Sequence, residues 1–190
     1  MRFILASASP RRNELLKQIG IEVDIEKSNY QECENIDYRT LVKVNTEGKL
    51  LEVVNRVLPK EDVVIAADTV VVLDGKVFGK PKNAANAKMM LRELSGKKHC
   101  VSTGIAIYYK GEIRYNYNDT DVFMNSITDE EIDSYVESGE PLDKAGAYAI
   151  QGKASVFVNK IDGCYSNVVG LSLPLLYKMF KELGINISFE

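Results

Sequence analysis

A short apolar segment that leads straight into an amphipathic helix opens this chain. Residues 3–6 are apolar, and Leu15, Leu16 and Ile19 recur at helical spacing. The residues between the two patterns are Ser7-Ala8-Ser9-Pro10-Arg11-Arg12. The sequence therefore predicts a strand over 2–6 and a helix over 10–19 that stops at Gly20. A strand followed so closely by a helix favours an α/β fold.

The start of this helix has the composition of an anion-binding site. Ser7 and Ser9 supply two hydroxyls; Ser9 suits the N-cap, and Pro10 suits the first helical position. The first amides of a helix have no internal partners and carry partial positive charge. Arg11 and Arg12 add guanidinium groups, which bind phosphate oxygens through paired donors. The alternative is an ordinary capped helix with two solvated arginines.

The same alternation of strands and helices continues along the chain, so we expect one α/β domain over 1–190 with mixed strand directions. Asp74-Gly75 indicates a hairpin turn, and residues 141–152 indicate a loop rich in small residues. The patterns predict strands at 21–25, 63–67, 70–73, 76–78, 99–109, 113–125 and 155–161, a short tail strand, and helices at 38–57, 83–94, 128–136 and 171–183.

The composition is that of an ordinary globular protein with no general affinity for polyanions. The net charge is −3, so any phosphate chemistry requires a local basic pocket. No run approaches the ~18 apolar residues of a membrane span, and Arg11 and Arg12 interrupt any signal-peptide core. The three cysteines are far apart, which favours reduced thiols in a cytoplasmic protein. The single histidine, His99, is expected to be structural.

Asp68 is the candidate for the acidic group of a reaction centre. It follows the apolar strand residues 63–67 directly, and a carboxylate there is costly unless it is paired, coordinated or at an open strand end. Such a group could bind Mg²⁺ or polarise water. Glu32 and Glu34 could add oxygen ligands from a loop. The alternatives are a turn cap for Asp68 and plain solvation for the two glutamates.

Two further segments could bind a nucleotide. Lys80 and Lys82 flank Pro81 and form a stiff basic corner, although such corners are often only solvated. The segment DKAGAYAIQG begins at Asp143; its small residues allow close approach of the backbone to a ligand. Within it, Tyr148 offers an aromatic face and Gln151 an amide that can read a base edge. The alternative for this segment is an ordinary glycine-rich turn.

Taken together, these segments resemble the Maf family of nucleoside triphosphate pyrophosphatases. The resemblance covers nearly the whole chain, and the combination of motifs is more specific than any single motif. The segments that carry it, in order, are LASASPRRNELL from Leu5, ADTVV from Ala67, GKP from Gly79, LRELSG from Leu91, DKAGAYAIQG from Asp143 and GCYSNVVGLSLP from Gly163.

The resemblance implies hydrolysis between the α and β phosphates, on an elongated mixed sheet with two lobes around a cleft, similar to the inosine triphosphatase fold. It implies a divalent metal ion, Mg²⁺ or Mn²⁺, and the subgroup that accepts dTTP and UTP. It assigns Asp68 as the proton acceptor, Arg11, Thr69 and Gln151 as specificity residues, and as other cleft residues Ser7, Arg12, Glu32, Lys80 and Asp143. From the residues themselves we add Ser9 and Lys82 as substrate-binding residues, and Glu32 and Asp68 as metal ligands.

The chain departs from the family pattern in the second helix, where the family places a lysine. Here the run reads Val44-Asn45-Thr46-Glu47-Gly48-Lys49, so Lys49 is the candidate, with a shift of one position that turns a helical side chain by about 100°. The expected partner is the nucleotide, without nucleic acid or membrane, and a homodimer is left open. The competing functions are a pyrophosphatase for a purine or modified nucleotide, and a non-catalytic nucleotide-binding regulator of septum formation.

Overall fold

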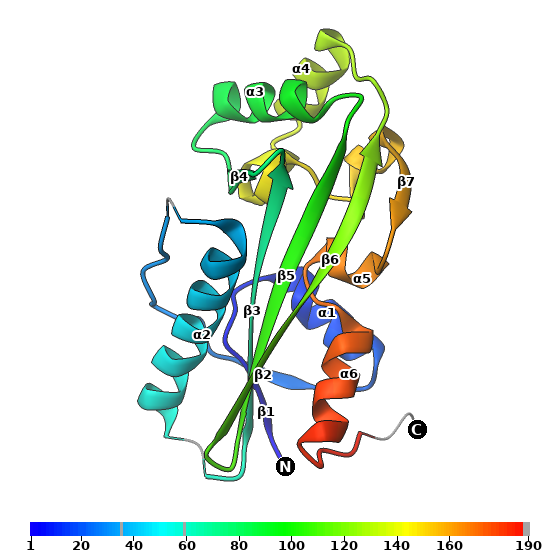
Figure 1. The fold of residues 1–190 in the computed structure, drawn as a ribbon. Coiled ribbons are helices and arrows are strands. Elements are labelled where there is room, and N and C mark those ends of the chain that lie inside the picture. Colours follow the sequence, from blue (N-terminus) through cyan, green and yellow to red (C-terminus); the bar gives the residue numbers. More distant parts are fainter. Residues whose placement is uncertain (35, 59, 188–190) are drawn as a thin grey trace. The chain divides into compact units, whose positions relative to one another are not determined.

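The computed structural model describes residues 1–34, 36–58 and 60–187, and it forms a mixed α/β fold (Figure 1). The elements in chain order are β1 Phe3–Leu5, α1 Pro10–Gln18, β2 Val23–Ile25, α2 Tyr38–Val57, β3 Val63–Leu73, β4 Lys76–Phe78, α3 Ala84–Leu94, β5 Lys98–Tyr109, β6 Glu112–Met124, α4 Asp129–Glu137, the 3-10 turns η1 Glu140–Asp143, η2 Ala145–Ala147 and η3 Lys153–Phe157, β7 Val158–Asp162, α5 Tyr165–Val169 and α6 Leu173–Glu182.

One seven-stranded mixed sheet has the strand order β2-β1-β3-β5-β6-β7, with β4 paired to β3. Strand β1 runs parallel to both β2 and β3. Strand β4 is antiparallel to β3, and β7 is antiparallel to β6. The predicted α/β class with mixed strand directions is thereby confirmed.

The chain divides into two compact units. The first comprises Met1–Asp68, Thr103–Asn118 and Gly170–Glu190, and the second comprises Thr69–Ser102 and Asp119–Val169. The boundary in β3 falls between Asp68 and Thr69, so these two neighbouring residues belong to different units. The cleft between two lobes stays a prediction.

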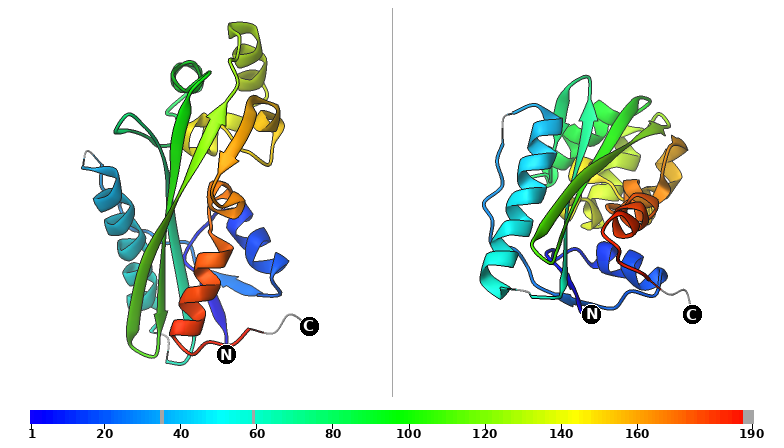
Figure 2. Two further views of the ribbon diagram at one scale, coloured as in Figure 1. Left: turned by 45° about the vertical axis from the view of Figure 1, so that its right-hand side comes forward. Right: turned by 60° about the horizontal axis from the view of Figure 1, so that its bottom comes forward.

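In the first unit, helices lie on both faces of the strands: α2 covers one face, and α1 and α6 cover the other (Figure 2). Leu50, Val53 and Val54 of α2 pack on Ile4 and Val64 of the strands. The helix comes close to β5 because Gly104 has no side chain; a Cβ there would lie 2.6 Å from atoms of the α2 side chains. The absence of a side chain at Gly104 therefore allows α2 to pack directly on β5.

In the second unit, α3 and α4 pack against each other and bury an apolar core with the strands. The fully buried members of α3 are Ala87, Leu91 and Leu94. The predicted hairpin turn between β3 and β4 is present: Asp74 and Gly75 have φ angles of 51° and 80°. Such positive values suit the two-residue turn that joins antiparallel strands.

Most element boundaries follow the sequence pattern. The strands expected at 63–67 and 70–73 form the single strand β3, and three other regions differ. The strand expected at 155–161 begins only at Val158, because residues 153–157 form η3. The short helix α5 was not predicted. No tail strand forms over 185–187, and residues 188–190 lie outside the described part. In residues 1–34, 36–58 and 60–187, no helix combines the length and apolar character needed to cross a membrane.

Candidate functional site

The hydrogen bonds at the start of α1 differ from those that the sequence suggested. Ser9 occupies the N-cap position with an extended backbone, and Pro10 follows it, as predicted. The Ser9 side chain, however, caps no helical amide. Instead, the Ser7 hydroxyl accepts hydrogen bonds from the Ser9 N–H at 3.2 Å and from Arg12 Nη1 at 3.0 Å. The prediction for Ser9 was therefore right in position and wrong in its hydrogen bond.

Arg12 is held rigidly beside this helix start. Its Nε donates to the carbonyl oxygen of Gly170 at 2.8 Å, which fixes the guanidinium plane. Burial lowers the pKa of Arg12 from its ordinary value, and the positive charge of Arg11 lowers it further. The negative charges of Asp68 and Glu32 act in the opposite direction. Arg12 thus lies within electrostatic reach of both candidate carboxylates.

Asp68 lies inside β3, and its partner is a lysine from the neighbouring helix. The residue is 7% exposed. Lys49 Nζ donates to Asp68 Oδ1 at 2.6 Å and lies 2.6 Å from Glu32 Oε1. The Lys49 side chain of α2 therefore does reach the candidate carboxylates, despite the shift from the family spacing. The sequence left this orientation open.

The carboxylates of Glu32 and Asp68 therefore contact the same cation, the Lys49 ammonium. We refer to the place of this ammonium as the cation position. A divalent ion such as Mg²⁺ binds through one or two protein carboxylates and completes its shell with water and phosphate oxygens. The oxygens of Glu32 and Asp68 fit that chemistry, since each already lies against the same ammonium group. Within the described part of the chain, no group of three or more His, Cys, Asp or Glu side chains is placed to hold a metal. A bound ion would depend on these two carboxylates together with the substrate.

In the second unit, the basic corner is tied to the turn that precedes Gln151. The Gly146 N–H donates to the Gly79 carbonyl oxygen at 3.0 Å, directly before Lys80. Gly146 has a φ of 68°, and a Cβ there would lie 2.9 Å from Val71 Cγ2. Glycine is required for both reasons, since L side chains rarely adopt this conformation. Lys80 and Lys82 are exposed.

The segment that carries Gln151 is held by hydrogen bonds to a carboxylate, Glu140, that the sequence did not indicate. Glu140 accepts hydrogen bonds from the Tyr135 hydroxyl at 3.1 Å and from the Lys153 N–H at 3.1 Å. A side chain at Gly152 would overlap the Glu140 carboxylate. Gln151 is exposed between these contacts. Asp143 is also exposed, and it forms an ion pair with Lys144.

Tyr148 does not offer an aromatic face to a ligand, so that interpretation was wrong. It is 6% exposed, and its hydroxyl lies 2.7 Å from Nε2 of the buried His99. Burial raises the pKa of Tyr148 above its ordinary value and lowers the pKa of His99 to about 4. His99 is therefore a neutral packing residue, as expected from the sequence.

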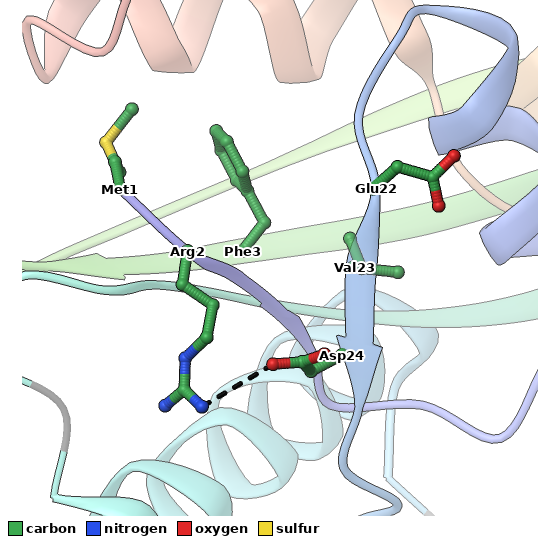
Figure 3. Close-up of a pocket in the computed structure, with 6 residues that line it drawn as sticks. All are labelled: Met1, Arg2, Phe3, Glu22, Val23 and Asp24. Atoms are coloured by element: carbon green, nitrogen blue, oxygen red, sulfur yellow. Dashed lines mark hydrogen bonds and ion pairs between the residues drawn. The ribbon is translucent and has the colours of Figure 1, made fainter.

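A surface hollow at the edge of the first unit lies elsewhere on the sheet. Figure 3 shows its lining side chains, Met1, Arg2, Phe3, Glu22, Val23 and Asp24, and the 3.5 Å ion pair between Arg2 and Asp24. Both partners are more than half exposed, so this pair contributes little to stability. None of the predicted site residues lines this hollow.

The predicted site residues fall into two groups. The first unit brings Arg12, Glu32, Lys49 and Asp68 into mutual electrostatic reach, with Ser7 bonded to Arg12. The second unit holds Thr69, Lys80, Lys82, Asp143 and Gln151. Thr69 directly follows Asp68 in β3, and consecutive strand residues face opposite sides of a sheet.

The chain belongs to the Maf-like protein family, whose model matches residues 2–183. A relative from Gloeobacter violaceus, named dTTP/UTP pyrophosphatase, is 47% identical over 184 residues, which are 96% of this chain and 96% of the relative. A relative of the same name from Clostridium tetani is 42% identical, covering 98% of this chain and 100% of its own. The structure of the Staphylococcus aureus Ham1 protein matches 96% of this chain and 100% of its own with a TM-score of 0.52 at 16% identity, which shows a shared fold.

Proposed function

We propose that this protein hydrolyses dTTP and UTP to the nucleoside monophosphate and pyrophosphate, as one catalytic domain over the whole chain. The observation that carries the proposal is the identity of 40–47%, over nearly the full length, to family members named dTTP/UTP pyrophosphatase. The two carboxylates that contact Lys49, together with Arg12 within electrostatic reach of them, supply a chemical basis for it. The protein would act on the nucleotide pool of the cytoplasm.

The first unit would hold the triphosphate and activate water. The start of α1 and the guanidinium of Arg12 would neutralise phosphate oxygens, because helix amides and arginine both bind anions. Asp68 would orient the attacking water and accept its proton, since its carboxylate is held by the sheet and by Lys49. Attack at the α phosphorus would expel pyrophosphate. Positioning and charge neutralisation account for most of the catalysis of phosphoryl transfer.

Glu32 and Asp68 would hold the Mg²⁺ or Mn²⁺ ion. When bound there, the ion would supply positive charge to the phosphate oxygens. Lys49 would keep the two carboxylates from repelling each other before substrate arrives, because its ammonium contacts both. The three side chains then form a site whose net charge is −1 without substrate.

Lys80, Lys82 and Asp143 are the proposed residues for further substrate binding, and Gln151 for reading the base. Lys80 and Lys82 are exposed and cationic. Asp143 is also exposed, and it precedes Gly146, whose N–H is bonded to the Gly79 carbonyl oxygen. We assign base selection to Gln151 and Thr69, together with Arg11 of the first unit. The Gln151 amide has both a donor and an acceptor, which suits the edge of a pyrimidine.

Replacement of Gln151 tests this assignment. We expect Gln151→Ala to change the ranking of dTTP, UTP and CTP more than it lowers turnover on the best of them, because the amide contacts the base and not the phosphates. Steady-state kcat/KM for the three nucleotides measures the effect. Equal losses on all three would assign Gln151 to a role other than base selection.

The function itself is tested with a panel of nucleoside triphosphates in Mg²⁺ or Mn²⁺, scored separately for pyrophosphate and phosphate. We expect pyrophosphate from dTTP and UTP, with lower rates on purine nucleotides. A preference for a purine or modified nucleotide would assign the chain another specificity. Binding of dTTP without any pyrophosphate release would favour a regulatory nucleotide-binding protein.

A further inference from the structure

A connecting segment is fastened along one face of α2 before the chain enters that helix. We refer to residues 26–33 as the strap; in Figure 1 it follows β2 (blue) beside α2. Its helix partners are spaced three or four residues apart, the spacing of side chains on one helix face. The contacts in strap order are Lys27 O with Arg56 Nη2 at 3.0 Å, Asn29 N with Glu52 Oε2 at 3.0 Å, Glu32 Oε1 with Lys49 Nζ at 2.6 Å, and Cys33 N with Asn45 Oδ1 at 2.8 Å.

Gly48 provides the space in which the strap approaches the helix. A Cβ on Gly48 would overlap three ring carbons of Tyr30. Apart from proline, glycine is the least favourable residue inside a helix, so a glycine in the middle of α2 has a packing reason here. The Tyr30 hydroxyl also lies 3.6 Å from Cys33 Sγ, which links the two ends of the turn that carries Glu32.

Asn45 holds the other side of the same turn. Its Oδ1 accepts from the Cys33 N–H at 2.8 Å, and its Nδ2 donates to the Cys33 carbonyl oxygen at 3.3 Å. Asn45 is only 3% exposed, so these bonds are shielded from water. The backbone next to Glu32 is therefore fixed on its C-terminal side by Asn45 and, two residues before Glu32, by the Tyr30 ring on Gly48.

We propose that Gly48 and Asn45 are positioning residues that place the Glu32 carboxylate at the cation position beside Asp68. The inference rests on the proposed function, in which Glu32 is a metal ligand. Neither residue touches the substrate; both act through the strap. The Glu32 side chain is 56% exposed, so the position of its carboxylate depends on the backbone that carries it as well as on its ion pair with Lys49.

The test compares Gly48→Ala, Glu32→Gln and the double variant with the wild type. In the protein without metal or nucleotide, we expect the Asn29 and Cys33 amides of Gly48→Ala to exchange hydrogen at least ten times faster, because the displaced ring releases the strap. Amides of the second unit should keep their rates. With dTTP and Mg²⁺, kcat/KM should fall at least tenfold in Gly48→Ala, and the Mg²⁺ concentration for half-maximal activity should rise.

The double variant separates positioning from a general loss of structure. If Gly48 acts through Glu32, the double variant loses no more activity than Glu32→Gln alone; multiplied losses would overturn the proposal. Wild-type exchange rates in Gly48→Ala would overturn it as well. Asn55→Ala is the matched control, because Asn55 is an exposed position of α2 and should leave exchange and activity unchanged.

Two further measurements cover the cases in which Gly48→Ala does not fold or the wild type is inactive. Asn45→Ala removes both bonds to Cys33 and should reproduce the faster exchange, which covers the case in which Gly48→Ala does not fold. If the wild type releases no pyrophosphate from dTTP or UTP, the proposed function fails. The exchange of the Asn29 and Cys33 amides then decides alone whether Gly48 and Asn45 hold the strap.

Discussion

Lys49 is the residue on which the charge balance of the first unit depends. Its ammonium lies 2.6 Å from carboxylate oxygens of Glu32 and Asp68, and the Lys49 and Asp68 side chains are only 14% and 10% exposed. Removal of one member of a buried ion pair leaves the other charge without compensation in a medium of low dielectric. The stability of β3 and α2 is therefore linked to the same contact that prepares the site.

Substitution Lys49→Met should destabilise the protein by about 3 kcal/mol at neutral pH, because the buried Asp68 carboxylate loses its ion-pair partner. Urea unfolding followed by circular dichroism measures the loss. Lys98→Met is the control: the ion pair of Lys98 with Asp121 is 56% and 39% exposed, so its removal should cost much less. Equal losses in the two variants would contradict a buried charge at Asp68.

The free energy of unfolding should depend on pH through one residue, His99. The folded pKa is lowered to about 4 from the ordinary 6.5 by burial, so the unfolded chain binds the proton more readily. The stabilising effect of the neutral ring is complete above the unfolded pKa and is lost as pH falls toward 4. Between pH 7.5 and 5.5 we expect a decrease of about 1 kcal/mol in the free energy of unfolding.

Urea unfolding at the two pH values measures this slope in the wild type and in His99→Gln. The chain has no other histidine, and carboxylates titrate mainly below this range. The slope should therefore nearly disappear in the variant. A variant that keeps the wild-type slope would show that another group titrates in this window.

At the scale of the elements, the helix ends show what a residue pattern can and cannot predict. Thr128 and Glu131 form a capping box at the start of α4, with both reciprocal hydrogen bonds. Ser9 has the same type of position at the start of α1, but its side chain caps no helical amide, and the N–H of Ser9 itself donates to the Ser7 hydroxyl. The residue type at an N-cap position therefore does not by itself predict that the capping hydrogen bond forms.

The two caps should differ in their contribution to stability. Thr128→Ala should lower the free energy of unfolding by about 1 kcal/mol, the usual effect of a lost N-cap. Ser9→Ala should change it by less than about half of that, since no capping bond is lost. Thermal and urea unfolding of the two variants measure the difference, and a larger effect of Ser9→Ala would contradict the hydrogen-bond arrangement at α1.

The bounds of helix α2 and strand β4 are those that the sequence pattern predicts. The pattern was wrong next to a place where the backbone is bonded to a distant side chain. Residues 155–157 were expected to extend β7, but they belong to η3. Just before them, the Lys153 N–H is bonded to the distant Glu140 carboxylate, and no local pattern indicates that contact.

At the scale of the whole molecule, the sequence indicated the family and the acidic and basic segments, but not the contacts among them. Arg12 and its acceptor Gly170 are 158 residues apart, and Lys49 and Asp68 are 19 apart. Such pairs depend on how strands and helices pack. A glycine inside a helix is unfavourable, so Gly48 indicates from the sequence alone that something packs closely there. Its partner Tyr30 could be identified only when the strap had been placed beside α2.

In the proposed reaction, water held by Asp68 attacks the α phosphorus of a pyrimidine triphosphate. Hydrolysis of dTTP in ¹⁸O-labelled water, followed by mass analysis of both products, tests it directly. We predict one ¹⁸O atom in the monophosphate and none in pyrophosphate, and a rate at least ~10²-fold lower for Asp68→Asn, the lower range of a general-base contribution. Label in the pyrophosphate, or near-full turnover by Asp68→Asn, would contradict the account.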